Sequence, residues 1–140
     1  MMKIFGKVKK IFEIFVIHCI NIYFNMTHRL KSNQVLFLSD VRDTLGGNLK
    51  VMYDYLDSDY YKKIVLLKAD RRVKRSIGEK LKLIKLLSTS KYILLDDFSN
   101  SISMMIPRKN QEIVQLWHGP GAFKKMGYSR PDKKSGMLSK

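Results

Sequence analysis

Residues 34–40 read Gln-Val-Leu-Phe-Leu-Ser-Asp, a short apolar run that ends abruptly in polar side chains. Its Val, Leu and Phe residues favour extended structure, and no polar residue alternates with them. Strands that are apolar on both sides are typical of a parallel sheet covered by helices on both faces. The run therefore predicts a buried strand over Gln34–Ser39.

The segments that follow repeat this pattern along the chain. Further apolar runs predict strands at Lys63–Leu67, Lys91–Leu95 and Glu112–Trp117, the last also with the look of a buried strand. Amphipathic stretches at Leu49–Asp57 and Ile77–Leu87 predict helices between them. Strands that alternate with helices indicate an α/β fold: a Rossmann-like parallel sheet with flanking helices.

The helical periodicity also predicts which side chains face the sheet. In the first helix the inward residues share one face: Leu49, Met52, Tyr53 and Leu56. In the second, the pattern predicts inward apolar residues and outward lysines: Ile77, Leu81, Ile84 and Leu87 inward, and Lys80, Lys82 and Lys85 outward.

Polar residues follow the predicted strands where a parallel sheet binds its ligands, at the carboxyl ends. They are Ser39-Asp40, Asp96-Asp97 and His118-Gly119. We interpret the aspartates as loop or cap residues, and Asn48 as the cap of the helix that it precedes. Cys19 and three scattered histidines have no ligand spacing, so no metal site is expected.

The most informative motif lies at residues 115–127, Gln-Leu-Trp-His-Gly-Pro-Gly-Ala-Phe-Lys-Lys-Met-Gly. A strand that leads into a titratable group, a Gly-rich turn and two cations is one way to build a site for an anionic substrate. The spacing alone leaves open a plain strand and turn followed by a solvated basic helix.

The motif resembles the W-H-G…K-K-x-G signature of the CDP-glycerol glycerophosphotransferase family, which makes teichoic acids and capsule polymers. The matching residues are Trp117, His118, Gly119, Lys124, Lys125 and Gly127. A looser match begins at Val35–Asp40 and continues through Asn48 into the first helix. The resemblance covers roughly residues 34–130.

The resemblance implies a mechanism and a set of site residues. His118 would deprotonate the acceptor hydroxyl, which would attack the β-phosphate of CDP-glycerol and release CMP. No cofactor is implied beyond this donor substrate. The substrate-binding residues would be Gly119, Gly121, Lys124, Lys125, Asn48 and Asp40.

The family is similar to GT-B enzymes, in which two Rossmann-like domains face a cleft. We therefore expect residues 31–127 to form the acceptor-side domain, residues 128–140 a flexible tail, and the donor-binding domain to be absent. Such a half would have little activity alone, because transfer depends on positioning donor and acceptor together. An inactive remnant is the alternative.

The composition favours anionic partners. Lys and Arg number 27 against 12 Asp and Glu, giving a net charge of +15. Such a field attracts nucleic acid, acidic lipid or phosphate polymers without choosing among them. A non-enzymatic binding protein is thus a second hypothesis, although no aromatic-basic signature supports nucleic acid.

Residues 1–30 predict an amphipathic helix at a membrane surface. A signal peptide is disfavoured, because no small-residue cleavage site follows the apolar stretch. A spanning helix is also disfavoured, because the apolar stretch at 11–26 falls short of the roughly 20 residues that span a bilayer. One polar stripe is expected, opposite apolar Ile, Phe and Val, at Lys7, Lys10, His18, Asn21, Asn25 and His28. The implied location is peripheral, on the cytoplasmic face of the plasma membrane, near a lipid-linked polyol-phosphate or glycan acceptor. The alternative is a helix that packs on its own domain.

Overall fold

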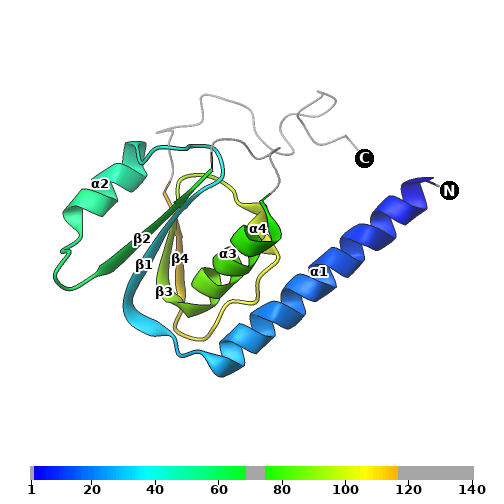
Figure 1. Cartoon of the computed structure of the whole chain (residues 1–140). Helices are drawn as coiled ribbons and strands as arrows, with labels where there is room; N and C mark the ends of the chain where they lie inside the picture. Colours follow the sequence, from blue (N-terminus) through cyan, green and yellow to red (C-terminus); the bar gives the residue numbers. More distant parts are fainter. Residues whose placement is uncertain (1, 69–74, 117–140) are drawn as a thin grey trace, which may run out of the picture.

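The computed structural model describes residues 2–68 and 75–116. The element order is α1 (Met2–Thr27), β1 (Lys31–Ser39), α2 (Gly47–Tyr55), β2 (Lys62–Leu67), α3 (Ile77–Thr89), β3 (Ser90–Leu95), α4 (Asn100–Ser103) and β4 (Glu112–Gln115) (Figure 1). The strands form one parallel sheet in the order β2-β1-β3-β4. This confirms the α/β, Rossmann-like fold predicted from the alternating runs.

Both faces of β1 are covered, which explains its unbroken apolar sequence. Successive side chains of a strand point to opposite faces of the sheet. Val35 and Phe37 therefore pack with Leu49 of α2, while Leu36 and Leu38 pack in a second cluster with leucines of α3. Central strands buried on both sides carry most of the hydrophobic stabilisation of such a sheet.

Helix α2 begins earlier than the sequence predicts. Its cap residue is Gly46, and Gly47 has a φ of 57°, a left-handed conformation that glycine adopts without steric cost. Asn48 therefore lies in the first turn, and the prediction that it caps the helix is wrong. The predicted inward face is confirmed, since Leu49 is buried and Met52, Tyr53 and Leu56 pack against the same cluster.

Helix α3 is rotated from its predicted orientation. Ile77 is 80% exposed and Leu81 is 41% exposed, so both were wrongly placed in the core; Leu83, Ile84 and Leu87 are buried instead. The reason is that α3 packs against α1 as well as the sheet. Lys80, predicted to face outward, reaches Glu13 of α1 with an Nζ–Oε1 distance of 2.6 Å.

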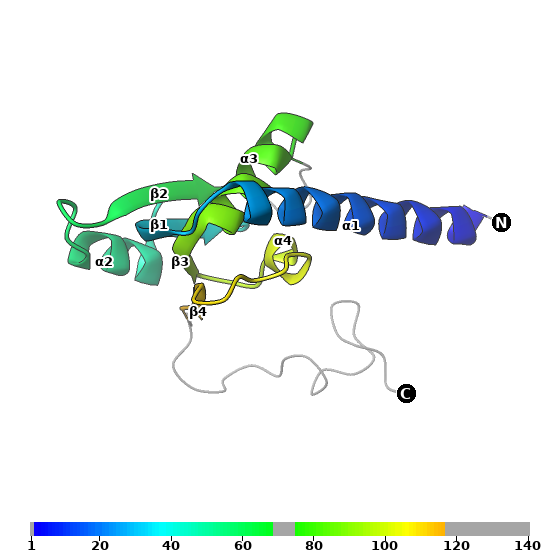
Figure 2. The same ribbon diagram turned by 90° about the horizontal axis from the view of Figure 1, so that it is seen from below.

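Helix α1 runs beside α3, and its N-terminal turns extend beyond the sheet (Figure 1, Figure 2). The described part of its polar stripe turns inward: Asn21 is completely buried and His18, Asn25 and His28 are partly buried, whereas Ile11, Phe15 and Met26 are more than 60% exposed. The side chains of Lys7 and Lys10 lie outside the described part. Within the described ranges, no helix combines the length and hydrophobicity needed to cross a membrane. The helix thus packs on its own domain through Asn21 and partly buried apolar residues, and leaves other apolar residues outside.

Strand β4 differs from the other strands in burial. It pairs only with β3, at the edge of the sheet, and all of its residues are exposed; Ile113 is 38% and Val114 43% exposed. The expectation of a buried last strand is therefore wrong for Glu112–Gln115, because α2 and α3 cover the central strands. Trp117, the end of the predicted run, lies outside the described residues.

Candidate functional site

The carboxyl ends of β1 and β3 lie side by side at the centre of the sheet. Strand β2 lies on one side of β1 and β3 on the other, so the crossover from β1 to β2 and the crossover from β2 to β3 run in opposite directions. Such a switch point is where doubly wound sheets bind ligands. Ser39, the last residue of β1, donates a hydrogen bond from Oγ to Oδ2 of Asp96 at 2.9 Å, and both residues are buried.

Arg42 completes this junction. Its Nε lies 3.2 Å from Oδ2 of Asp96, so the buried carboxylate has a cationic partner from the loop after β1. The guanidinium also lies against Gly46 and Gly47, at the start of α2. The positive end of a helix and an arginine that is about half exposed together favour an anion at this edge.

Asp40 joins two further loops to the same edge. Its Oδ1 lies 2.6 Å from a terminal nitrogen of Arg75, and its Oδ2 accepts a hydrogen bond from Ser99 Oγ at 2.6 Å. The Asp40 and Arg75 side chains are only 10% and 9% exposed. A carboxylate with both oxygens engaged in this way fixes the loop after β3 against the start of α3. We therefore assign Asp40 a role in organising the edge.

The remaining aspartate, Asp97, lies in the loop between β3 and α4, and Ser99 rather than Asp97 is the cap residue of α4. Oδ1 of Asp97 accepts a hydrogen bond from the backbone N–H of Phe98 at 2.7 Å. Within residues 2–68 and 75–116, no group of three or more His, Cys, Asp or Glu residues could hold a metal ion. The polar cluster at this edge therefore consists of ion pairs and hydroxyls.

The structure places only part of the predicted site. Asp40 lies at the switch point and Asn48 in the first turn of α2, whereas His118, Gly119, Gly121, Lys124 and Lys125 lie outside the described residues. Strand β4 pairs in register with β3, Gln115 opposite Leu95, so it ends at the same edge.

Sequence reasoning placed Ser39 at this edge but missed Arg42, Arg75 and Ser99. Arg75 and Asp40 are 35 residues apart, and nothing in their spacing marks them as a pair. The available signal was weaker: a serine and an arginine close to a strand end that also carries an aspartate.

Comparison with known proteins identifies related chains. Residues 20–140 match the family model described as CDP-Glycerol:Poly(glycerophosphate) glycerophosphotransferase. The chain is 41% identical over 120 residues to the teichoic acid ribitol-phosphate polymerase TarL of Staphylococcus aureus, covering 81% of this chain and 21% of that protein. It is 43% identical over 121 residues to TarK, a polymerase of the same description from that organism, covering 81% and 23%.

A third relative is a teichoic acid ribitol-phosphate primase of Bacillus spizizenii, which is 34% identical over 118 residues, covering 79% of this chain and 30% of that protein. The chain thus spans between about a fifth and a third of the length of these relatives. The family match covers most of the chain, including the sheet, its carboxyl edge and the motif at 115–127. This chain therefore belongs to the CDP-glycerol glycerophosphotransferase family.

Proposed function

We propose that this chain forms the acceptor-side part of a polyol-phosphate transferase of teichoic acid or capsule polymer synthesis. The observation that carries the proposal is the family match over residues 20–140 on a parallel sheet whose carboxyl edge gathers Ser39, Asp40 and Asp96. The acceptor is a lipid-linked polyol phosphate or glycan. The donor is CDP-glycerol, as in the family description, with a ribitol-phosphate donor as the alternative raised by the relatives.

In the proposed reaction His118 acts as general base. Neutral imidazole takes the proton from the acceptor hydroxyl as its oxygen attacks the β-phosphorus of the donor. The new P–O bond replaces the bond to the bridging oxygen, and CMP leaves with the electron pair. The acceptor polymer is now longer by one polyol phosphate, joined through a new phosphodiester. The imidazolium of His118 then loses its proton to solvent.

The strand pairing supports a place for His118 at this edge. His118 follows Gln115, the end of β4, by only three residues. Three residues reach at most about 11 Å, a span that is compatible with the proposed place of His118 at the carboxyl ends of the sheet. Gly119 and Gly121 would let the backbone approach a phosphate, while Lys124 and Lys125 would offset acceptor charge. Asp40, which follows β1, and Asn48, in the first turn of α2, approach the same edge.

The test is CMP release. The full chain is incubated with CDP-glycerol or CDP-ribitol, a lipid-linked acceptor and the donor-binding part of a relative. We expect turnover that needs both proteins and falls by a factor of about 100 or more in His118→Ala, the contribution of a general base. His28→Ala is the matched control, because His28 lies between α1 and β1, near the amino end of β1 and not at the carboxyl ends of the strands. Equal turnover by His118→Ala would refute the assigned role.

We also propose peripheral attachment to the cytoplasmic face of the plasma membrane through α1. One face of α1 carries exposed side chains at steps of three and four; we call this the outer face, and it comprises Val8, Ile11, Phe15, Cys19, Ile22 and Met26. A helix of this kind lies in the headgroup region of a bilayer, and a basic protein is drawn to anionic lipid. The net charge of +15 favours an anionic membrane surface over a neutral one.

A further inference from the structure

A cavity of about 660 Å³ lies between α1, α3 and α4, next to the carboxyl end of β1. This volume is in the range of sites for small ligands. It is separate from the junction of Ser39, Arg42 and Asp96, none of which lines it. Asp40 and Arg75 connect the two, because their ion pair forms part of the cavity wall.

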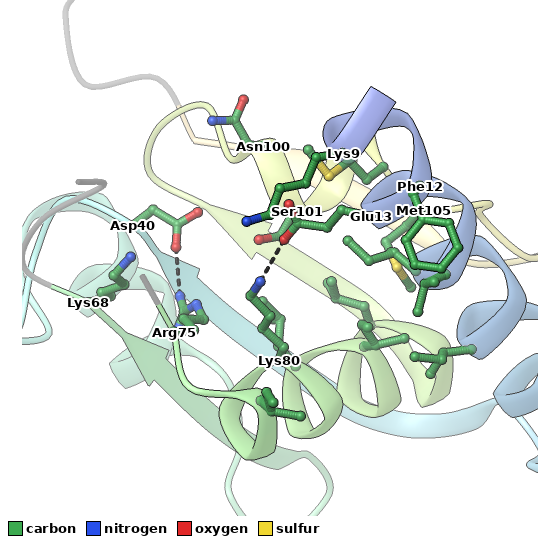
Figure 3. Close-up of a pocket in the computed structure, with 18 residues that line it drawn as sticks. Lys9, Phe12, Glu13, Asp40, Lys68, Arg75, Lys80, Asn100, Ser101 and Met105 are labelled. Atoms are coloured by element: carbon green, nitrogen blue, oxygen red, sulfur yellow. Dashed lines mark hydrogen bonds and ion pairs between the residues drawn. The ribbon is translucent and has the colours of Figure 1, made fainter. Parts of the chain in front are cut away.

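The cavity has two chemically different ends (Figure 3). Its interior is apolar and comes from the facing surfaces of three helices: Phe12, Val16, Ile17 and Ile20 of α1, Leu83, Ile84 and Leu87 of α3, and Met104 and Met105 around the end of α4. Apolar walls of this kind favour a hydrocarbon chain, because contact with them removes part of the chain from water. A hydrated glycan or polyphosphate gains nothing from such walls.

The other end is polar and positively charged. Four cations, Lys9, Lys68, Arg75 and Lys80, line it against two carboxylates, Glu13 and Asp40. Figure 3 shows Asp40, Lys68 and Arg75 on the side away from Phe12 and Met105. Within the part of the chain that the structure describes, Lys9 and Lys68 form no ion pair with a carboxylate.

The two ion pairs at this end differ in strength. Lys80 and Glu13 have side chains 42% and 52% exposed, and a pair this exposed contributes only about 0–1 kcal/mol. Lys80 can therefore exchange its carboxylate for another anion at little cost. Arg75 is held by the nearly buried Asp40 and stays in place. Three lysines are thus available to one anionic head.

We propose that this cavity binds a lipid with a phosphate head group, one hydrocarbon chain entering between α1 and α3 and the phosphate resting on Lys9, Lys68 and Lys80. The lipid comes from the membrane on which α1 lies, and it is the lipid part of the lipid-linked acceptor. This identification of the lipid with the acceptor rests on the proposed function. Its chemistry is amphiphilic: neither free phosphate nor an uncharged lipid satisfies both ends of the cavity.

The apolar end of the cavity is tested with dodecyl phosphate below its critical micelle concentration. Binding to the full-length protein is measured by isothermal titration calorimetry. Val16→Trp fills the cavity, and we expect it to weaken binding about tenfold or more. Val51→Trp is the matched control, because Val51 is an exposed valine of α2 that neither lines the cavity nor belongs to the outer face of α1. Met104→Trp fills the cavity from the opposite wall and should repeat the loss, so that misfolding of one variant does not decide the outcome.

The phosphate-binding end is tested by charge removal. In Lys9→Gln/Lys68→Gln we expect binding of dodecyl phosphate to fall about tenfold and binding of dodecanol to stay unchanged. Lys82→Gln/Lys85→Gln removes the same charge from exposed positions of α3 outside the cavity and is the control. Inorganic phosphate alone should bind at least about a hundredfold more weakly, because it gains nothing from the apolar walls.

Equal binding by the filled and control variants, or equal affinity for inorganic phosphate, would overturn this assignment. The outcome is separable from that of the proposed function. Amphiphile binding that depends on Val16 and Lys68, together with absent CMP release, would sink only the transferase assignment. CMP release that needs His118 but is indifferent to Val16→Trp and to the charge change, with no amphiphile binding, would sink only the lipid site.

Discussion

Asn21 of α1 donates a hydrogen bond from Nδ2 to Ser88 Oγ of α3 at 2.8 Å, and both residues are buried. Its Oδ1 accepts from the backbone N–H of Ile106 at 3.0 Å, so one amide joins α1 to α3 and to the segment after α4. Only one rotation of α1 satisfies both ends of this amide. The contact therefore selects the face of α1 that packs inward, and leaves the outer face exposed.

The first prediction concerns this amide. Asn21→Leu keeps the branched shape of the side chain but removes the donor to the buried Ser88 Oγ and the acceptor of the part-buried Ile106 N–H. We expect the free energy of unfolding to fall by about 1–3 kcal/mol, the cost of an unsatisfied buried polar group. Urea denaturation measures it. Asn25→Leu is the control: the hydrogen bond that Asn25 Nδ2 donates to Ile106 O is 3.4 Å long and exposed, so the cost of losing it should be smaller.

The second prediction concerns the outer face of α1. Phe15→Asn/Ile22→Asn should reduce partition into vesicles containing phosphatidylglycerol by about tenfold or more, because burial of two such side chains is worth several kcal/mol. Co-sedimentation measures this. Val51→Asn/Tyr55→Asn removes exposed apolar residues from α2 instead and should leave partition unchanged. Added salt should weaken binding of the unchanged protein.

Two results would contradict the membrane assignment. One is equal partition by both double variants. The other is a concentration-dependent dimer in sedimentation velocity that Phe15→Asn/Ile22→Asn abolishes while vesicle binding persists, which would assign the outer face to a second copy of the chain. The steps of three and four along this face also suit a two-stranded helix pair, so both measurements belong in one experiment.

The sheet could be predicted because its signal is local. Each apolar run contained a strand, and the alternation of Val35, Leu36 and Phe37 places neighbours on opposite faces whatever else the chain does. The face of α3 could not be read in this way. Which face of α3 is buried depends on α1, a helix about 60 residues away in sequence. The ion pair with Glu13 also directs Lys80 toward α1.

At the carboxyl edge of the sheet, too, some positions could be predicted from the sequence and their contacts could not. The position of Asp40 and Asp96 at strand ends followed from the runs, but their partners came from loops whose course no periodicity gives. Arg108 is a further example: it donates to the carbonyl oxygens of His28 and Ser88, at 2.7 and 3.3 Å, and so ties the ends of α1 and α3 together. A lone arginine in a loop predicts none of this, because long-range polar contacts leave no pattern in the sequence.

The third prediction concerns the ion pair at the switch point. Arg75→Met leaves the nearly buried carboxylate of Asp40 without its cation, and we expect a loss of about 3 kcal/mol in the free energy of unfolding. Asp40→Asn/Arg75→Met should recover part of that loss, because no uncompensated charge remains. Lys50→Met breaks the exposed pair with Asp54 and is the control, with an expected cost below about 0.5 kcal/mol. Equal costs for Arg75→Met and Lys50→Met would show that Asp40 is not held by this pair.

The fourth prediction concerns the start of α3, where Ser76 and Glu79 form a capping box. Ser76 Oγ accepts from the Glu79 N–H at 3.3 Å, and Oε2 of Glu79 accepts from the Ser76 N–H at 2.7 Å. The backbone hydrogen bond from Ser76, followed by its side-chain hydrogen bond, lowers the pKa of Glu79 below its ordinary 4.5. Ser76→Ala should cost about 1 kcal/mol at neutral pH.

The sign of the pH dependence follows from that shift. A carboxyl whose pKa is lower in the folded state binds more protons when the chain unfolds, so its contribution is fully present above the unfolded pKa and is lost as pH falls through the folded value. Glu79→Gln should therefore differ from the unchanged protein at pH 6 and converge with it at pH 3, in urea denaturation at both pH values. Asp54→Asn is the control, as an exposed carboxylate outside the box. A stability difference for Glu79→Gln that grows toward pH 3 would contradict the capping role, because protonation would then strengthen the start of α3.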